Sequence, residues 1–252
     1  MRFLSHIMRR MKNKKLKAIL SISGYFLLVL ALCFVGGLVF HSYYYEPIYV
    51  SGSSMSPTLN GADNEKSGSV VDFGIVDNHA SAINHIKRFS IISTYYPTSD
   101  DYKDNGELRN GAKKKIKRVI ALPNETFQIK DGLLSVKKDG EFISVKYDFE
   151  VVETTAKDTI EPITLGKDEY WCLGDNRPHS HDCASIGKPI KKSNISGVLV
   201  AIEGQAKLKQ KRMVCYNCGK GFSSGETCPN CYYPLNPEYE LVNKSYSWPK
   251  FY

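Results

Sequence analysis

A serine-rich segment, SGSSMSPTL at residues 51–59, carries hydroxyl groups that could attack a carbonyl carbon. Such an attack needs a base, because the serine proton must leave as the new bond forms. Proteins supply either a histidine held by an acid or a lysine kept neutral by burial. The segment alone is also typical of a polar surface loop, so the base decides between the two interpretations.

Lys117 has the sequence context that such a base requires. It lies between Ile116 and the apolar run at 119–122, whereas the lysines at 113–115 lack an apolar context and are expected at the surface. Alternation along a strand places Arg118 on the opposite face. The nucleophile elbow of α/β-hydrolases is excluded, because Ser56 stands where its last glycine would be.

The elements that must position these groups begin with a membrane anchor. Residues 18–40 form an apolar run without charged side chains, which as a helix would span about 34 Å and cross a ~30 Å hydrocarbon core. The aromatic residues of HSYYYEPIY then suit the membrane interface. Seven basic residues lie in 1–17 and none follows the run until Lys66, so the positive-inside rule predicts a cytoplasmic N-terminus and an extracytoplasmic remainder.

The distribution of charge argues against a nucleic-acid-binding face. The net charge is +8, but seven of the 34 basic residues lie in the first 17 positions. The rest of the chain holds 27 basic and 26 acidic side chains. The basicity therefore belongs to an N-terminal tail at 1–17 and not to the folded part.

Beyond the anchor the chain is typical of short strands separated by turns, without a long amphipathic helix. The clearest strand candidates are VVDFGIV, FSIISTYY, IKRVIAL, ETFQIKDGLLSVKKDGEFISV, EYWCLGD and ISGVLVAI. Asp131-Gly132 and Asp139-Gly140 predict hairpin turns, and residues 98–112 predict a polar loop. We expect a mainly β protein, with an all-β catalytic domain at 41–204 on one transmembrane helix and a separate cysteine-rich tail at 211–252.

Three segments in this order resemble the sequence boxes of bacterial type I signal peptidases, the Ser-Lys membrane proteases that release exported proteins from leader peptides. They are SGSSMSPTL at 51–59, KRVIALPNE at 117–125 and GDNRPHSHDCASIG at 174–187. The resemblance covers about residues 18–203 and implies a signal-peptidase-like catalytic domain. It assigns Ser54, which precedes methionine, as the nucleophile and Lys117 as the base. Ser180 would orient the lysine amine, and the implied supporting residues are Asp182, Arg118 and Asp175.

The resemblance also implies a mechanism and a substrate. Neutral Lys117 would take the proton of Ser54, Ser54 would attack the carbonyl after the last leader residue, and water would release the acyl-enzyme. Small residues at −1 and −3 would enter shallow pockets lined by Ile48, Val50, Met55 and Ile116, for which ordinary strand packing is an equally open role. The implied partners are exported preproteins, the lipid bilayer and, as a further candidate, the export machinery. No catalytic cofactor is implied.

Two positions near Asp182 depart from the pattern of the family. Ala184 replaces the arginine of the third box and Cys183 replaces a serine. Asp182 then lacks its usual neighbouring cation, and we expect Arg118 or Arg177 to compensate its charge.

The tail contains two CxxC pairs, Cys215/Cys218 and Cys228/Cys231. Paired CxxC turns are typical of a four-thiolate metal site, with zinc as the expected ion. The segment resembles a zinc ribbon or a rubredoxin-like pair, which could also hold iron. Disulfides remain an alternative, because the predicted location is outside the cytoplasm. A bound metal would staple a segment too short to build its own core.

The sequence therefore predicts a single-pass membrane serine endopeptidase that cleaves signal peptides after a small residue. Two alternatives stay open: a peptidase of the same family dedicated to one pilin, transfer or coat protein, and an inactive membrane-anchored zinc-ribbon binding protein. The inactive alternative predicts loss of Ser54 or Lys117, and both are present.

Overall fold

A computed structural model describes residues 14–61, 68–98, 101–103, 107–109, 112–152, 159–215, 217–222, 228–232 and 235–243, with the backbone alone at 14–21, 41–42, 209–212 and 236–243. Most of the predicted basic tail lies outside the described residues, as do parts of the predicted loop at 98–112 and of the predicted tail at 211–252. The chain divides into two units, Met1–Tyr44 and Tyr45–Tyr252.

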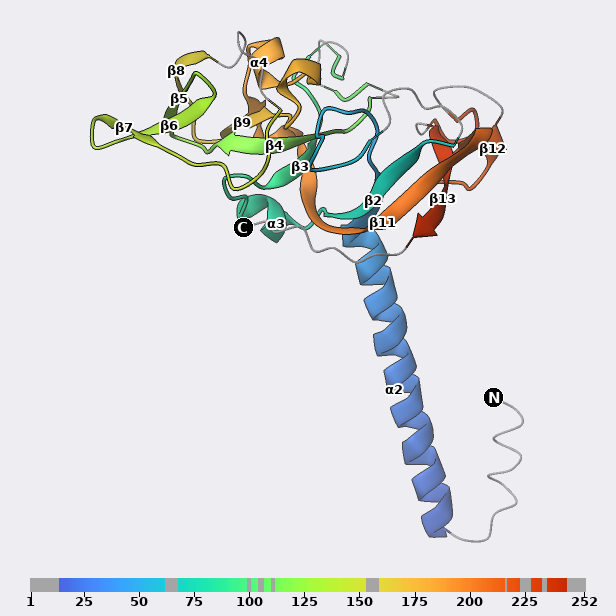
Figure 1. The fold of residues 1–252 in the computed structure, drawn as a ribbon. Helices are drawn as coiled ribbons and strands as arrows, with labels where there is room; N and C mark the ends of the chain where they lie inside the picture. Colours follow the sequence, from blue (N-terminus) through green and yellow to red (C-terminus); the bar gives the residue numbers. More distant parts are fainter. Residues whose placement is uncertain are drawn as a thin grey trace. The chain divides into compact units, whose positions relative to one another are not determined.

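The first unit contains one long helix, α2 (Lys14–Tyr44), drawn in blue in Figure 1. Its segment Ile22–Phe40 has a mean hydropathy of 2.4, and none of it is buried inside the protein. A helix that is apolar all round and unburied is typical of a membrane span. The helix is consistent with the anchor that the sequence predicts at 18–40.

The second unit is built mainly from two antiparallel sheets (Figure 1). The larger sheet has the strand order β1-β2-β11-β3-β4-β9-β10, and β12 and β13 also pair with β11. Its strands are β1 (Tyr45–Tyr49), β2 (Val70–Asp77), β3 (Ile91–Thr94), β4 (Lys115–Ala121), β9 (Glu169–Leu173), β10 (Ile190–Lys191), β11 (Ile195–Val214), β12 (Gly221–Phe222) and β13 (Asn236–Asn243). Lys117 therefore lies on a strand inside the sheet, between β3 and β9.

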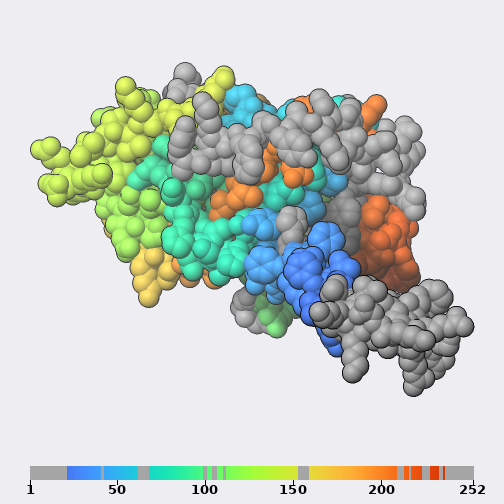
Figure 2. Space-filling model, turned by 90° about the horizontal axis from the view of Figure 1, so that it is seen from below, coloured from blue at the N-terminus to red at the C-terminus, as the bar shows by residue number. Residues whose placement is uncertain are grey.

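The smaller sheet has the order β7-β6-β5-β8. Its strands are β5 (Thr126–Lys130), β6 (Leu133–Lys138), β7 (Glu141–Ser144) and β8 (Ile160–Thr164). Both predicted turns connect its hairpins, with φ of 51° and 77° at Asp131-Gly132 and of 51° and 93° at Asp139-Gly140. Positive φ at both central residues is the conformation that Asp-Gly pairs favour. The β6–β7 hairpin forms one end of this unit, and β12 lies at the opposite end (Figures 1 and 2).

In the described part of the second unit the helices are short, as the sequence predicts. They are α3 (Ala80–Asn84), α4 (Cys183–Ile186) and the 3-10 turns η1 (Arg177–His179) and η2 (Lys192–Asn194). Both η1 and α4 follow β9, so the third sequence box folds into a compact loop with two helical turns.

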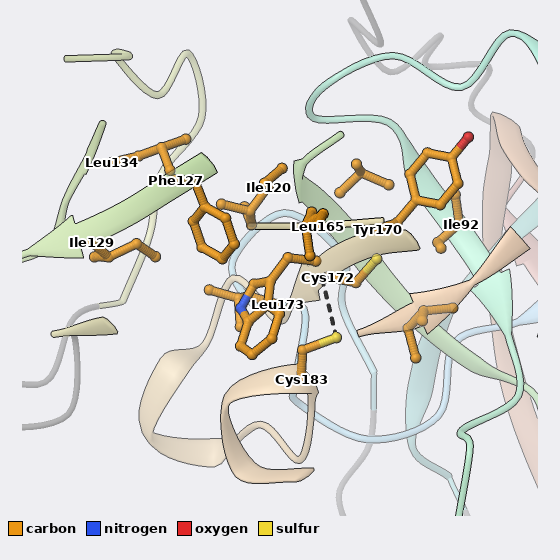
Figure 3. Close-up of a cluster of buried hydrophobic side chains, with 14 of the residues drawn as sticks. Ile92, Ile120, Phe127, Ile129, Leu134, Leu165, Tyr170, Cys172, Leu173 and Cys183 are labelled. Carbon is orange, nitrogen blue, oxygen red and sulfur yellow. Dashed lines mark hydrogen bonds between the residues drawn. The ribbon is translucent and has the colours of Figure 1, made fainter. Parts of the chain in front are cut away.

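A large apolar core joins the two sheets (Figure 3). Phe127 of the small sheet packs against Trp171 of β9, with ring centroids 5.5 Å apart. Ile129 and Leu134 are buried in the same core, as is Leu173, the last residue of β9. Burial of side chains of this size contributes about 1.5–3 kcal/mol each. The core therefore fixes the end of β9, from which the third box begins.

The strand candidates read from the sequence are found as β2–β7, β9 and the first part of β11. The sequence does not predict β1, β8, β10, β12 or β13. Of these, β10 and β12 have two residues each, and β8 contains a proline, which is unfavourable inside a strand. β11 continues to Val214, so the predicted boundary between 204 and 211 falls within one strand.

Candidate active site

The serine-rich segment forms a turn that is anchored by β2 and by its own apolar side chains. Val50 N donates to the carbonyl oxygen of Asp72 at 2.9 Å, and Leu59 N donates to that of Met55 at 2.9 Å. Val50, Met55 and Leu59 are buried. Ser54, which lies between the anchoring residues, stays partly exposed.

The side chains of Ser54 and Lys117 meet. Lys117 Nζ lies 2.8 Å from Ser54 Oγ and 2.9 Å from the carbonyl oxygen of Ile116. Lys117 is only 4% exposed. Burial lowers the pKa of Lys117 to about 8, although the nearby carboxylates of Asp182 and Asp175 raise it. A neutral amine at this distance can accept the serine proton.

The loop after β9 holds the serine turn in place. Asn176 donates its backbone N–H to the carbonyl oxygen of Ser54 at 3.0 Å, and its Nδ2 to that of Ser53 at 3.1 Å. Gly174 passes between this turn and Ser180. A Cβ added at Gly174 would lie 2.4 Å from the carbonyl oxygen of Ser54 and 2.3 Å from Ser180 Oγ. Sequence reasoning missed both roles, and the only signal was that Gly174 and Asn176 belong to the third box.

A buried ion pair connects the three segments. Arg118 Nη2 lies 2.6 Å from Asp175 Oδ2, and the two side chains are 5% and 1% exposed. Thr58, in the serine segment, donates its hydroxyl to the same oxygen at 2.6 Å. The ring of Phe149 lies 3.7 Å from the guanidinium carbon of Arg118. Thr58 is a further residue that the sequence analysis did not single out.

The expectation that Arg118 or Arg177 compensates Asp182 is wrong. Asp182 accepts hydrogen bonds from the backbone N–H of Gly174 at 2.9 Å and from that of Ala184 at 3.1 Å. The second bond caps α4. Arg118 pairs with the other aspartate, and Arg177 Nε donates to the Gly174 carbonyl oxygen. Backbone N–H groups stabilise a carboxylate without a cation, which explains how the site tolerates alanine at position 184.

Ser180 lies close to Ser54, across Gly174, without the predicted bond to Lys117. Its Oγ is buried and has no hydrogen-bond partner in the part of the chain that the structure describes. A hollow of about 390 Å³ opens next to it, with Asp182, Ala184 and Leu173 among its lining residues. The small side chain at position 184 leaves this space open.

The predicted pocket residues gather in one apolar cluster. Val50 and Met55 are buried in it, and Ile48 and Ile116 pack against it. β1 is an edge strand of the large sheet. β4 pairs with β9 only from Arg118 onward within the described residues, so its first residues have no strand partner on that side. Among the described residues, two strand edges without a partner strand therefore flank the cluster.

Comparison with known proteins agrees with this arrangement. A family model described as "Signal peptidase, peptidase S26" matches residues 21–202, which include all three boxes. The chain belongs to this family. It is therefore a serine peptidase of the signal peptidase I family, whose members need no cofactor for catalysis.

The relatives of this signal peptidase are distant. Signal peptidase I T of Bacillus subtilis (strain 168) is 31% identical over 152 residues, which are 58% of this chain and 66% of that relative. Signal peptidase I U of the same organism is 30% identical over 184 residues, with 71% and 83% covered. A crystal structure of a signal peptidase I from Enterococcus faecalis V583 is 25% identical and has a TM-score of 0.33, covering 45% of this chain and 96% of that one.

The four tail cysteines lie beyond the region that the family model matches, and they form a cluster. Their Sγ atoms lie within 4.8 Å of one another, with 3.3 Å between Cys215 and Cys231 and 3.7 Å between Cys218 and Cys228. Cys215 and Cys228 are buried together with Leu235. Cys215 directly follows β11, so the cluster is attached to the large sheet.

Proposed function

We propose that this signal peptidase is a membrane-anchored endopeptidase that removes signal peptides from exported preproteins by cutting after a small residue. Ser54 is the nucleophile and Lys117 the base. The observation that supports this most strongly is the 2.8 Å contact between Ser54 Oγ and the Nζ of a buried lysine. The family match supplies the signal-peptide substrate class.

In the proposed acylation step, neutral Lys117 takes the proton of Ser54 while Oγ attacks the scissile carbonyl carbon. The Ser54 backbone N–H stabilises the oxyanion. The Lys117 ammonium then gives its proton to the leaving amine, which departs with the mature protein. In deacylation the amine, neutral again, takes a proton from water while the hydroxide attacks the ester carbon. The Lys117 ammonium then returns this proton to Ser54 Oγ as the signal peptide leaves. The lysine is therefore base and acid in turn.

The substrate would lie between the open edges of β1 and β4. An extended peptide adds main-chain hydrogen bonds to exposed strand edges, and its side chains alternate between the two faces. Its −1 and −3 side chains would then both face the apolar cluster around Val50 and Ile48. The close packing of this cluster explains a preference for small residues at these two positions.

The test is cleavage of a model preprotein by the detergent-solubilised full chain, with product sequencing. We expect wild type to cut after a small residue, and Ser54→Ala and Lys117→Ala to lose at least about 1000-fold in kcat/KM. Lys138→Met, at an exposed position on β6, is the matched control and should cut like wild type. Undiminished cleavage by the two dyad variants would rule out this mechanism.

The proposed orientation places the N-terminus in the cytoplasm and the catalytic unit outside. It rests on the seven basic residues in 1–17 and on the apolar helix that follows them. Protease treatment of right-side-out membrane vesicles should degrade the catalytic unit and spare an N-terminal tag. Loss of the tag with survival of the catalytic unit would reverse the orientation.

The cysteine cluster is proposed to hold one structural zinc ion. Four thiolates at the ~2.3 Å Zn–S distance form a tetrahedron with sulfur–sulfur edges of about 3.8 Å, close to the separations seen here. The backbone N–H groups of Asn230 and Cys231 point at the sulfur of Cys228, as is favourable for a thiolate. The Sγ separations of 3.3 and 3.7 Å are longer than the ~2.05 Å of a disulfide bond and suit a four-thiolate site.

Metal analysis of the purified full chain tests this site. We expect about one zinc per chain in wild type, and loss of zinc with a lower melting temperature in Cys228→Ser. Cys33→Ser, in the anchor helix, is the matched control and should keep the metal. A chain that is four mass units lighter, without metal and without titratable tail thiols, would instead establish two disulfides.

A further inference from the structure

An ion pair bridges the two strand edges that flank the proposed substrate cleft. The Glu46 carboxylate on β1 contacts Lys114 Nζ, which directly precedes β4. Asn78 Nδ2 donates to the same Glu46 oxygen at 3.1 Å, so the carboxylate is held from two sides. The two charged side chains are 37% and 30% exposed.

The position of this pair follows from the spacing of residues along the strands. Residues two apart on an extended chain share a face, so Glu46 and Ile48 follow one another along β1, and Val50 comes next, directly after its end. Lys114 likewise lies two residues before Ile116 and shares its face. Ile48 and Ile116 pack on the apolar cluster. The ion pair therefore lies two residues further along both chain segments, at the end of the cleft that is farther from Ser54.

A bound peptide steps along this line at the same interval as β1. With the −1 side chain beside Val50 and the −3 side chain beside Ile48, the next side chain on that face is the one at −5. We propose that the Glu46–Lys114 pair forms the outer boundary of the substrate cleft and sets the charge selectivity at substrate position −5. This inference rests on the proposed function, because it needs a signal peptide bound between β1 and β4.

The charge balance of the pair defines the selectivity. Two opposite charges in contact present little net charge to a neighbouring side chain, so wild type should accept Ala, Lys and Glu at −5 at similar rates. Removal of Lys114 leaves the Glu46 carboxylate to attract a lysine at −5. Removal of the Glu46 charge leaves the Lys114 ammonium to attract a glutamate. The two changes therefore predict opposite preferences.

The experiment measures kcat/KM of the detergent-solubilised full chain on quenched peptides that carry Lys or Glu at −5. We expect Lys114→Met to favour the −5 Lys peptide about threefold to fivefold over the Glu peptide, and Glu46→Gln to show the reverse. Both preferences should weaken at high salt. Lys138→Met should keep the flat preference of wild type. The charge-reversed double variant, Glu46→Lys with Lys114→Glu, should restore a flat preference and so exclude a folding defect as the cause.

Peptides with the same substitutions at −4 serve as the substrate control, because that side chain points to the opposite face. Equal shifts at −4 and −5 would overturn the inference, as would two single variants with unchanged or parallel preferences. Both results leave the proposed function intact if wild type cuts after a small residue. Failure of wild type to cut any of the peptides or a model preprotein would remove the proposed function and this inference together.

Discussion

The charge of Asp182 is expected to control the pH at which this peptidase works. In the proposed mechanism the rate of acylation depends on the neutral fraction of Lys117, whose pKa burial lowers from 10.5 to about 8. The carboxylate of Asp182 raises the pKa of Lys117, because its negative charge favours the ammonium form. Asp182→Asn removes that charge and keeps one side-chain oxygen to accept an N–H bond. We predict that the substitution lowers the pKa of Lys117 below that of wild type.

The magnitude follows from the fraction of neutral amine at pH 7. A lysine of pKa 10.5 is about 0.03% neutral there, whereas one of pKa about 8 is roughly 10% neutral. Burial thus raises the concentration of the base about 300-fold. Wild type is still mostly protonated at pH 7, so its kcat/KM should rise roughly tenfold between pH 7 and a plateau above pH 9.

The assay is kcat/KM on a quenched signal-peptide substrate from pH 6 to pH 10 at constant ionic strength. We expect a single ascending limb with its midpoint near pH 8 for wild type and at lower pH for Asp182→Asn. Glu141→Gln, which removes an exposed carboxylate on β7, should leave the midpoint unchanged. A wild-type midpoint near 10.5, or a midpoint that moves upward in Asp182→Asn, would refute the reasoning.

Three further substitutions test the surroundings of Ser54 and Lys117. Arg118→Met leaves buried Asp175 without its cation and should lower the free energy of unfolding by about 3–5 kcal/mol, measured by denaturant titration. Gly174→Ala places a Cβ 2.4 Å from the carbonyl oxygen of Ser54, so kcat should fall while circular dichroism reports an intact fold. Ala184→Arg introduces a cation at the hollow and should move the midpoint of the pH profile below pH 8, because a nearby cation disfavours protonated Lys117. Unchanged stability in Arg118→Met, unchanged kcat in Gly174→Ala or an unchanged midpoint in Ala184→Arg would contradict the corresponding expectation.

The sequence predicts the fold best where local chemistry alone decides the structure. Asp131-Gly132 and Asp139-Gly140 specify their turns through positive φ, and the apolar runs around Lys117 and Trp171 specify buried strands. β1 and β13 escape prediction because pairing with distant strands defines them. Glu46 and Pro47 carry no strand pattern by themselves, and β1 forms because β2 offers its edge from Phe73 to Asp77.

In the site, likewise, the sequence predicts which residues take part but not which hydrogen bonds they form. The boxes predict which side chains approach one another, and the structure brings Ser54 to Lys117 as expected. They do not predict hydrogen-bond partners, since these depend on where the third-box loop turns. In that loop Asp182 accepts a hydrogen bond from the N–H of Gly174 instead of pairing with an arginine. The backbone N–H of Asn176 donates to the carbonyl oxygen of Ser54.

The two carboxylates near Lys117 differ in how their charges are balanced, and this difference links the alanine at position 184 to catalysis. Asp175 is paired with Arg118, so much of its charge is cancelled. Among the described residues, Asp182 accepts hydrogen bonds from two backbone N–H groups and pairs with no arginine, so its negative charge acts on the lysine. Asp182 raises the pKa of Lys117 more than Asp175 does. An arginine beside Asp182 would cancel that charge and produce more neutral lysine at pH 7. The alanine of this chain therefore makes its proposed activity depend more steeply on pH between 7 and 9.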